Sequence, residues 1–233
     1  FHQGAEGARE VWVANADGSG AVNVSNNAGD DANPTWSPDG TRLAFQSNRA
    51  GNWDIIVVNA DGTGLSNMTS GVTLDDERPV WSPNGQMIAY VRNAKLTAKF
   101  VSGGSPFELS TLSVTTSSFP EWASDSSQIL FGHPNPSTTD LYVVDAQMTP
   151  DAPQNITNTT TPETGYDWAP GPRIAFVGYG TSGTDVFAVD ANAANLLNVT
   201  DDDDSVFSPQ WTPAGDAIIF TSDAGGSREV WSV

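Results

Sequence analysis

Tryptophan recurs at regular intervals along the whole chain. Successive spacings are 45, 41, 46 and 43 residues, between Trp36, Trp81, Trp122, Trp168 and Trp211. An aromatic residue follows each of them by eight or nine positions, at Phe45, Tyr90, Phe131, Phe176 and Phe220. Internal repeats of about 40 to 45 residues are typical of propeller blades with four strands each. Aromatic side chains bury about 150 to 250 Å² each, so we expect these tryptophans to be structural anchors packed between adjacent blades.

Strand and turn signals agree with this reading. An acidic residue opens a short apolar run nine positions after four of the recurring aromatics, at Asp54, Asp140, Asp185 and Glu229. Runs rich in β-branched and aromatic residues predict strands. Pro38-Asp39-Gly40 and Asp61-Gly62 supply hairpin turns, because Gly tolerates positive φ. No helical period extends over ten residues, so the chain is expected to be all-β, with four-stranded antiparallel blades.

The repeat also predicts where the blades lie. A single domain over 1–233 would hold a partial blade at 1–25, blades at about 34–69, 79–110, 120–157 and 166–200, and a partial blade at 208–233. About five blades are expected, with six as the alternative. The third strand of the 79–110 blade is degraded and is expected at Ala98 to Ser102.

The two ends of the chain match the same part of a blade. Residues 7–12 and 226–231 differ at one position only, and both contain Glu-Val-Trp, at Glu10-Val11-Trp12 and Glu229-Val230-Trp231. Either the ends join in one composite blade that closes the ring, or a strand is shared between chains. An unpaired edge strand is a template for another chain, so these six residues are candidates for an assembly strand.

The segment Trp36-Ser37-Pro38-Asp39-Gly40, repeated at Trp81-Ser82-Pro83-Asn84-Gly85, resembles the repeat of the TolB-like propellers, which are similar to WD repeats. The resemblance implies a propeller over almost the whole chain. Such repeats occur in periplasmic adaptors, in gating domains of peptidases and in polysaccharide-processing enzymes, so the resemblance does not fix a function. The TolB adaptor carries a separate N-terminal α/β domain that this sequence lacks, so a Tol role is not favoured.

Charge narrows the range of partners. The chain has 28 Asp and Glu against nine Lys and Arg, a formal net charge of −19. Such a surface repels nucleic acid and anionic membranes, and it suits a basic protein partner or cations. No apolar run approaches the ~20 residues of a membrane-spanning helix. The sequence starts at Phe1 and lacks Cys, and we expect an exported chain trimmed of its leader, or a fragment, in an extracellular, cell-surface or periplasmic location.

Neither histidine predicts catalysis. Hydrolysis of the Ser-His-Asp type needs a histidine between a nucleophile and a carboxylate. His2 lies beside the N-terminus, and His133 is expected in a loop with Pro134 and Pro136. We therefore expect a non-enzyme with no catalytic residue and no cofactor, although a pair of carboxylates could act in acid–base chemistry.

Two further sets of residues are candidates for binding or modification. Acidic clusters precede three first strands, and their carboxylates could bind Ca²⁺, at Asp30, Asp31, Asp75, Asp76, Asp201, Asp202, Asp203 and Asp204. The pattern Asn-x-Ser/Thr, which is both an N-glycosylation signal and a feature of the repeat, occurs at Asn23, Asn67, Asn155, Asn158 and Asn198.

The sequence thus predicts a non-catalytic, secreted or cell-surface propeller that acts in protein interaction or self-assembly, including filament formation. One alternative is a carbohydrate-binding or carbohydrate-processing propeller that uses carboxylates on its rim, with or without Ca²⁺. Another is the propeller part of a larger peptidase or Tol-type adaptor.

Overall fold

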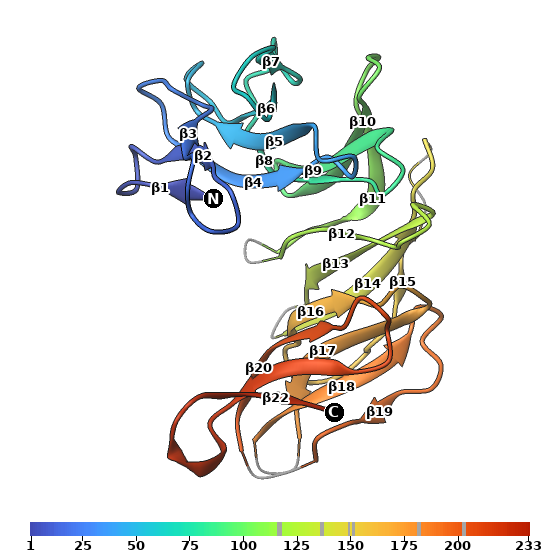
Figure 1. The fold of residues 1–233 in the computed structure, drawn as a ribbon. Coiled ribbons are helices and arrows are strands. Elements are labelled where there is room, and N and C mark those ends of the chain that lie inside the picture. The colour runs from blue at the N-terminus through green and yellow to red at the C-terminus, as the bar shows by residue number, and fades with distance from the viewer. Residues whose placement is uncertain (116–117, 136–137, 149, 151, 181–182, 202–203) are drawn as a thin grey trace. The chain divides into compact units, whose positions relative to one another are not determined.

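The fold is all-β. The structure, a computed structural model, describes residues 1–115, 118–135, 138–148, 150, 152–180, 183–201 and 204–233. These residues form six antiparallel sheets and one short 3₁₀ turn, Ala224–Gly226. No helix within the described ranges is long and apolar enough to cross a membrane. The chain divides into two compact units, Phe1–Leu109 and Ser110–Val233, and each is considered by itself (Figure 1).

The first unit contains two sheets and most of a third. Its first sheet has the order β1 (His2–Gln3), β2 (Glu10–Val13) and β3 (Val22–Asn23). The second sheet consists of β4 (Asp31–Trp36), β5 (Arg42–Ser47), β6 (Asp54–Asn59) and β7 (Ser66–Asn67). The third consists of β8 (Asp76–Trp81), β9 (Met87–Arg92), β10 (Lys95–Phe100) and β11 (Phe107–Ser113), and the chain leaves the unit within β11.

The second unit contains the three remaining sheets. The fourth sheet consists of β12 (Glu121–Trp122), β13 (Gln128–Pro134), β14 (Thr139–Asp145) and β15 (Gln154–Asn155). The fifth consists of β16 (Thr164–Trp168), β17 (Arg173–Tyr179), β18 (Thr184–Asp190) and β19 (Leu197–Asn198). The sixth has three strands, β20 (Val206–Trp211), β21 (Ile218–Ser222) and β22 (Glu229–Ser232).

This architecture confirms the predicted all-β propeller class, and it differs from the sequence analysis in two places. The N-terminal sheet contains an additional strand, β1, which pairs with β2. The third strand of the third sheet begins at Lys95 and not at Ala98, because Asn93 and Ala94, with φ of 47° and 60°, form a two-residue hairpin turn. Both φ values are positive, as type I′ hairpins require. The extent of a single domain over 1–233 stays a prediction.

Aromatic residues fill the space between neighbouring sheets within each unit. In the first unit, Trp81 of β8 packs against Ala44 and Ile55 of the preceding sheet, and the Arg42 guanidinium lies 5.0 Å from the centre of its ring. In the second unit, Trp168 packs against Leu130 and Leu141 of the preceding sheet. Trp81, Trp122 and Trp168 are buried, and Trp211 is half-buried.

Trp36 departs from the expectation of a buried anchor, because 46% of its surface is exposed. Trp81 is the residue of the third sheet that corresponds to Trp36 of the second. It is covered in part by Arg42 and Ala44, which lie at the start of β5 in the preceding sheet. The sheet that precedes Trp36 has the two-residue strand β1 at this place. Phe1 corresponds to Phe45 in the repeat, so the described residues contain no counterpart of Arg42 or Ala44 to cover the indole.

Candidate functional site

A cluster of three polar side chains joins the third and fourth strands of the second sheet. Asp54 at the start of β6 accepts hydrogen bonds from Asn67 Nδ2 at 2.7 Å and from Thr69 Oγ1 at 3.2 Å. Thr69 Oγ1 in turn accepts the main-chain N–H of Ile55 at 3.0 Å. Asp54, Thr69 and Ile55 are buried, so every partner satisfies a group that would otherwise be costly to bury. We call this arrangement the strand-closing cluster.

The strand-closing cluster recurs in the first and fifth sheets and, in part, in the fourth, where Thr157 Oγ1 donates to Glu163 and not to Asp140. In the first sheet, Glu10 accepts from Ser25 Oγ at 2.7 Å and from Asn23 Nδ2 at 3.3 Å. In the fourth sheet, Asn155 Nδ2 donates to Asp140 at 2.7 Å, and in the fifth, Asn198 Nδ2 donates to Asp185 at 2.8 Å. In each of these sheets, the residue directly after the acidic residue donates its main-chain N–H to a Ser or Thr hydroxyl. The donor and acceptor residues are Val11 and Ser25, Leu141 and Thr157, and Val186 and Thr200.

The strand-closing clusters occupy four of the five candidate glycosylation sites. The side-chain amides of Asn23, Asn67, Asn155 and Asn198 all donate within their own sheets. A glycan on one of these nitrogens would replace an N–H and disturb this arrangement. Asn158 differs, because it is exposed with φ of 49° and its main-chain N–H alone bonds to Asn155.

The sixth sheet presents the same acidic position with no fourth strand beside it. Glu229 begins β22 as Asp54 begins β6, and among the described residues β22 pairs with β21 alone. Every residue of β22 is exposed, including 72% of Val230 and 45% of Trp231. No hydrogen bond of the Glu229 side chain occurs within the part of the chain that the structure describes. We call Glu229–Ser232 the open edge.

The other candidate assembly strand is not open. Glu10, Val11 and Trp12 lie in β2, which is the middle strand between β1 and β3. The two ends of the chain therefore belong to separate sheets in the structure. A composite blade made from both ends, or a strand exchanged between chains, stays a prediction.

The acidic clusters proposed for cation binding are largely neutralised by arginine. Asp30 forms an ion pair with Arg9, and this contact with the hydrogen bonds from Arg9 lowers the pKa of Asp30 to about 2. The first unit contains two more such pairs, between Asp31 and Arg49 at 3.2 Å and between Asp76 and Arg92 at 2.6 Å. Asp30, Asp31 and Asp76 are buried, and each has a cationic partner in place of a metal.

The remaining acidic candidates do not gather into a metal site either. Asp75 accepts the main-chain N–H of Trp53 at 2.9 Å, and Asp201 accepts from Asn198 at 3.3 Å. Asp204 also has an interaction partner, whereas Asp202 and Asp203 lie outside the described residues. Within the described ranges, no three carboxylates or histidines come together as metal ligands. Ca²⁺ binding is untested and stays a low-ranking prediction.

Both histidines have structural surroundings. His2 is exposed in the short strand β1. His133 lies on strand β13 and not in a loop as expected, because the pairing of β13 with β14 continues as far as Pro134 opposite Thr139. His133 Nδ1 contacts the Ser113 carbonyl oxygen at 2.7 Å, and its ring packs edge-on against Tyr142.

A pair of carboxylates that the sequence analysis did not single out meets in the second unit. Glu121 and Asp167 each precede an anchor tryptophan, and their side chains share a hydrogen bond. Glu121 also accepts the Trp168 N–H at 3.1 Å, and Asp167 accepts the Trp211 N–H at 2.5 Å. Burial and the charge of Asp167 raise the pKa of Glu121 to about 8, and burial raises the pKa of Asp167. Two carboxyl groups can share a hydrogen bond only when one of them is protonated, and the raised pKa values favour that state.

This geometry is unlike that of a glycosidase. The two carboxyl groups of a glycosidase stand about 5 to 9.5 Å apart, with the substrate between them. Glu121 and Asp167 touch each other, and both bind main-chain N–H groups of the following sheets. The pair therefore serves the packing of these strands. Acidic residues directly before two successive anchor tryptophans were the signal in the sequence that could have revealed it.

Comparisons with known proteins agree with the architecture. The family model of the TolB beta propeller domain matches residues 1–149. No curated protein matches the chain. TolB from Acinetobacter baumannii superimposes with a TM-score of 0.66 at 17% identity, over 97% of this chain and 60% of that one. The chain thus spans less than two thirds of that TolB.

Two other solved structures are similar. An oligogalacturonate lyase from Vibrio parahaemolyticus gives a TM-score of 0.71 at 14% identity, over 94% of this chain and 68% of the lyase. The β-propeller domain of the Trilobed protease from Pyrococcus furiosus, described as having an open velcro topology, gives 0.70 at 11% identity, over 100% of this chain and 76% of that one. At such identities the likeness shows the fold alone. Since the family model covers well over half of its residues, the chain belongs to the TolB β-propeller domain family.

Proposed function

We propose that this chain is a protein-interaction domain whose open edge accepts a further β-strand, either from a continuation of its own chain or from a partner polypeptide. The observation that supports the proposal is that, among the described residues, β22 pairs with β21 alone, whereas in four other sheets a further strand places an Asn that donates to the same acidic position. An exposed edge strand offers a row of unpaired main-chain groups to another chain.

The closed sheets indicate the chemistry of the partner strand. In the first, second and fifth sheets, an Asn amide and a Ser or Thr hydroxyl two positions later both donate to the acid, and in the fourth sheet the Asn amide alone does. The two residues together form the pattern Asn-x-Ser/Thr. We therefore expect the partner to supply an extended segment with this pattern between apolar residues. Val230 and Trp231 would gain cover from its apolar side chains, since both are exposed.

A peptide with the sequence of residues 64–70, which forms the fourth strand of the second sheet, is the direct probe. We expect it to bind the intact chain in isothermal titration calorimetry, and Glu229→Ala to weaken binding. Glu108→Ala provides the matched control, because Glu108 is also an exposed carboxylate on a strand. Peptides with Ala in place of Asn or Val in place of Thr should bind less well. Equal binding of all three peptides would contradict the proposal.

A second copy of the chain is one partner that could supply a strand to the open edge. The domain would then form concentration-dependent oligomers, including filaments, visible by analytical ultracentrifugation and electron microscopy. The 64–70 peptide should dissociate them, because it competes for the open edge. Dispersed monomers at high concentration would limit the partner to another protein.

We also propose that the domain acts in the cell envelope or outside the cell. Membership of the TolB family and the net charge of −19 support this location. Fractionation of the native cells with immunodetection tests it, and recovery in the cytoplasmic fraction alone would contradict it.

The likeness to the Trilobed protease propeller favours one alternative, a non-catalytic propeller attached to a peptidase. In that case the open edge would receive a strand of the attached domain. Immunodetection in the native cells distinguishes the two, because a peptidase would appear at a mass far above the 24.5 kDa of this chain.

A further inference from the structure

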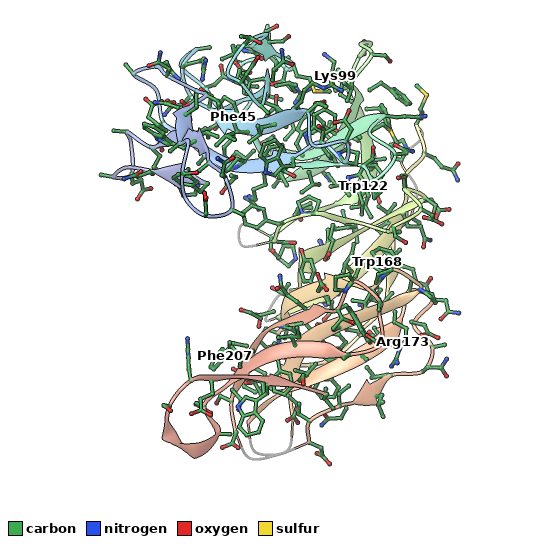
Figure 2. The ribbon with its side chains drawn as sticks, in the orientation of Figure 1. Phe45, Lys99, Trp122, Trp168, Arg173 and Phe207 are labelled. Carbon is green, nitrogen blue, oxygen red and sulfur yellow. The ribbon has the colours of Figure 1, made fainter. Side chains whose placement is uncertain are left out.

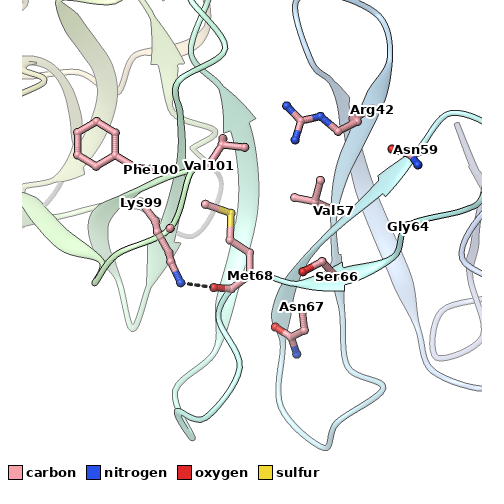
Figure 3. A pocket seen from close by; sticks show the side chains of 11 residues that line it. Arg42, Val57, Asn59, Gly64, Ser66, Asn67, Met68, Lys99, Phe100 and Val101 are labelled. Carbon is pink, nitrogen blue, oxygen red and sulfur yellow. Dashed lines mark hydrogen bonds between the residues drawn. The ribbon is translucent and has the colours of Figure 1, made fainter.

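A groove lies between the second and third sheets of the first unit (Figure 3). It has a volume of about 490 Å³ and lies between strands β6 and β7 on one side and the end of β10 on the other. Its apolar lining comes from Val57, Met68, Phe100 and Val101, and its charged lining from Arg42 and Lys99. A volume of this size is within the range of small-molecule sites, about 300 to 1,000 Å³.

Lys99 stands where the repeat has a buried valine. It pairs with Ile88, as Val58 pairs with Leu43, Val144 with Ile129 and Val189 with Ile174 in the other complete sheets. Those three valines are buried. Lys99 is half-buried, and its Nζ donates to the Met68 carbonyl oxygen at 2.6 Å. An ammonium carries three donors, so two N–H groups of Lys99 are left for a ligand.

Arg42 supplies a second cation to the same groove. Its guanidinium lies over the Trp81 ring, 5.0 Å from the centre, and Arg42 also lines the groove (Figure 3). Other arginines of this unit, Arg9, Arg49 and Arg92, form ion pairs with buried aspartates. Arg42 and Lys99 form no ion pair with any residue that the structure describes. Asp39, whose charge acts on Arg42, is outside the groove lining.

The charge of the groove is opposite to that of the chain. The lining contains two of the nine basic residues and none of the 28 acidic ones. A cation that replaces a core valine is a departure from the repeat, and it gains only the hydrogen bond to the Met68 carbonyl oxygen. Such departures mark functional sites. In Figure 3 the two cations lie on opposite sides of Met68 and Val57. A ligand that meets both must therefore carry negative charge around an apolar body.

We propose that this groove binds a small organic anion with an apolar body and two carboxylates, one for Arg42 and one for Lys99. Guanidinium and ammonium donors form strong, charge-assisted hydrogen bonds with carboxylates. Met68, which is flexible and polarisable, adapts to the apolar part. The site is separate from the open edge, and it does not depend on strand addition.

Methionine methyl NMR of the intact chain tests the proposal. The chain has three methionines, of which Met68 lines the groove, Met87 is buried in β9 and Met148 is exposed. Suberate, a linear dicarboxylate, is the probe, and the neutral diol of the same length is its control. We expect suberate to shift the Met68 methyl resonance saturably and to leave Met87 and Met148 in place. The diol should have no effect.

The test uses variants whose new residue already occupies the same position in other blades, so the variants are expected to fold. Lys99→Val installs the residue of the other blades, and Arg42→Gln installs the counterpart residue Gln128. Each should weaken suberate binding at least about tenfold. Arg173→Gln is the matched control, since Arg173 stacks on Trp211 in the second unit as Arg42 stacks on Trp81. An unshifted Met68 methyl, equal binding of the diol, or an equal loss in Arg173→Gln would overturn the proposal.

Discussion

Thr69 Oγ1 accepts the main-chain N–H of Ile55 at 3.0 Å, and both residues are buried. The contact gives the second sheet its fourth strand, because Ser66–Asn67 pairs with β6 over two residues only. Such a short strand gains little from its own ladder. The Asn67 amide, which lies in this strand, and the Thr69 hydroxyl, which follows it, therefore determine whether the strand stays paired with the sheet.

Replacement of this hydroxyl should destabilise the protein clearly. Thr69→Val keeps the shape of the side chain but leaves the Ile55 N–H without its acceptor and removes one of the donors to Asp54. We expect a loss of about 1 to 3 kcal/mol in the free energy of unfolding, measured by urea denaturation. Ser70→Ala, at the exposed neighbouring position, should change it by less than about 0.5 kcal/mol. Equal effects would contradict the role of the strand-closing cluster.

The carboxylate pair predicts an unusual dependence of stability on pH. The pKa of Glu121 is raised to about 8 from its ordinary value of 4.5, so the folded chain holds a proton that the unfolded chain releases. A group with a raised acidic pKa favours folding less as pH rises, here between about pH 4.5 and 8. Glu121→Gln should reduce this dependence and stabilise the protein above pH 8 by on the order of 2 kcal/mol.

Denaturation curves between pH 5 and 9 measure this difference between variant and parent. Glu108→Gln, at an exposed position on β11, provides the control and should leave the slope unchanged. A parallel pair of curves for Glu121→Gln and the parent would show that the two carboxyls do not share a proton.

The tryptophan anchors should differ in their contribution to stability. Trp81→Ala removes a buried ring from the space between two sheets, and a loss of about 3 to 5 kcal/mol is expected. Trp36→Ala removes a side chain with 46% of its surface exposed, and the loss should stay below about 1.5 kcal/mol. Thermal and urea denaturation of the two variants compare them. Similar losses would mean that Trp36 is covered in solution.

Among the glycosylation candidates, Asn158 should be modified before the other four. Its side-chain amide makes no hydrogen bond within the described residues, whereas Asn23, Asn67, Asn155 and Asn198 donate to carboxylates. Expression in a eukaryotic secretory host, followed by peptide mapping after enzymatic deglycosylation, measures occupancy site by site. Asn158→Gln should remove most of the attached carbohydrate. Higher occupancy at Asn67 would contradict this order.

The sequence predicted the features that recur and missed those that occur once. Tryptophan spacing and turn residues define the blades, and Figure 2 labels Trp122 and Trp168, which stand on the first strands of two successive sheets. The exposure of Trp36 depends on a neighbouring sheet that lacks the covering residues, which the tryptophan itself does not reveal. β10 starts earlier than predicted because Asn93 and Ala94 form a two-residue turn. No other blade has this turn within the described residues, so the repeat could not predict it.

The candidate sites show the same division. Glu229 was identified because it matches Asp54 in the repeat, whereas its open edge follows from pairings that only the structure provides. Glu121 and Asp167 are 46 residues apart in sequence, and the meeting of their side chains depends on the stacking of sheets. Lys99 was placed in a degraded strand, and its correspondence to Val58 became visible with the pairing of β9 and β10.

The strand-closing clusters affect how the triplet Asn-x-Ser/Thr is interpreted in sequences of this family. An oligosaccharyltransferase recognises this triplet, but here its Asn bonds a carboxylate and its hydroxyl accepts a buried main-chain N–H. Four of the five triplets hold one strand each against its sheet through hydrogen bonds to a carboxylate. Their presence in a chain of this kind is therefore explained by the fold and is not by itself a sign of attached carbohydrate.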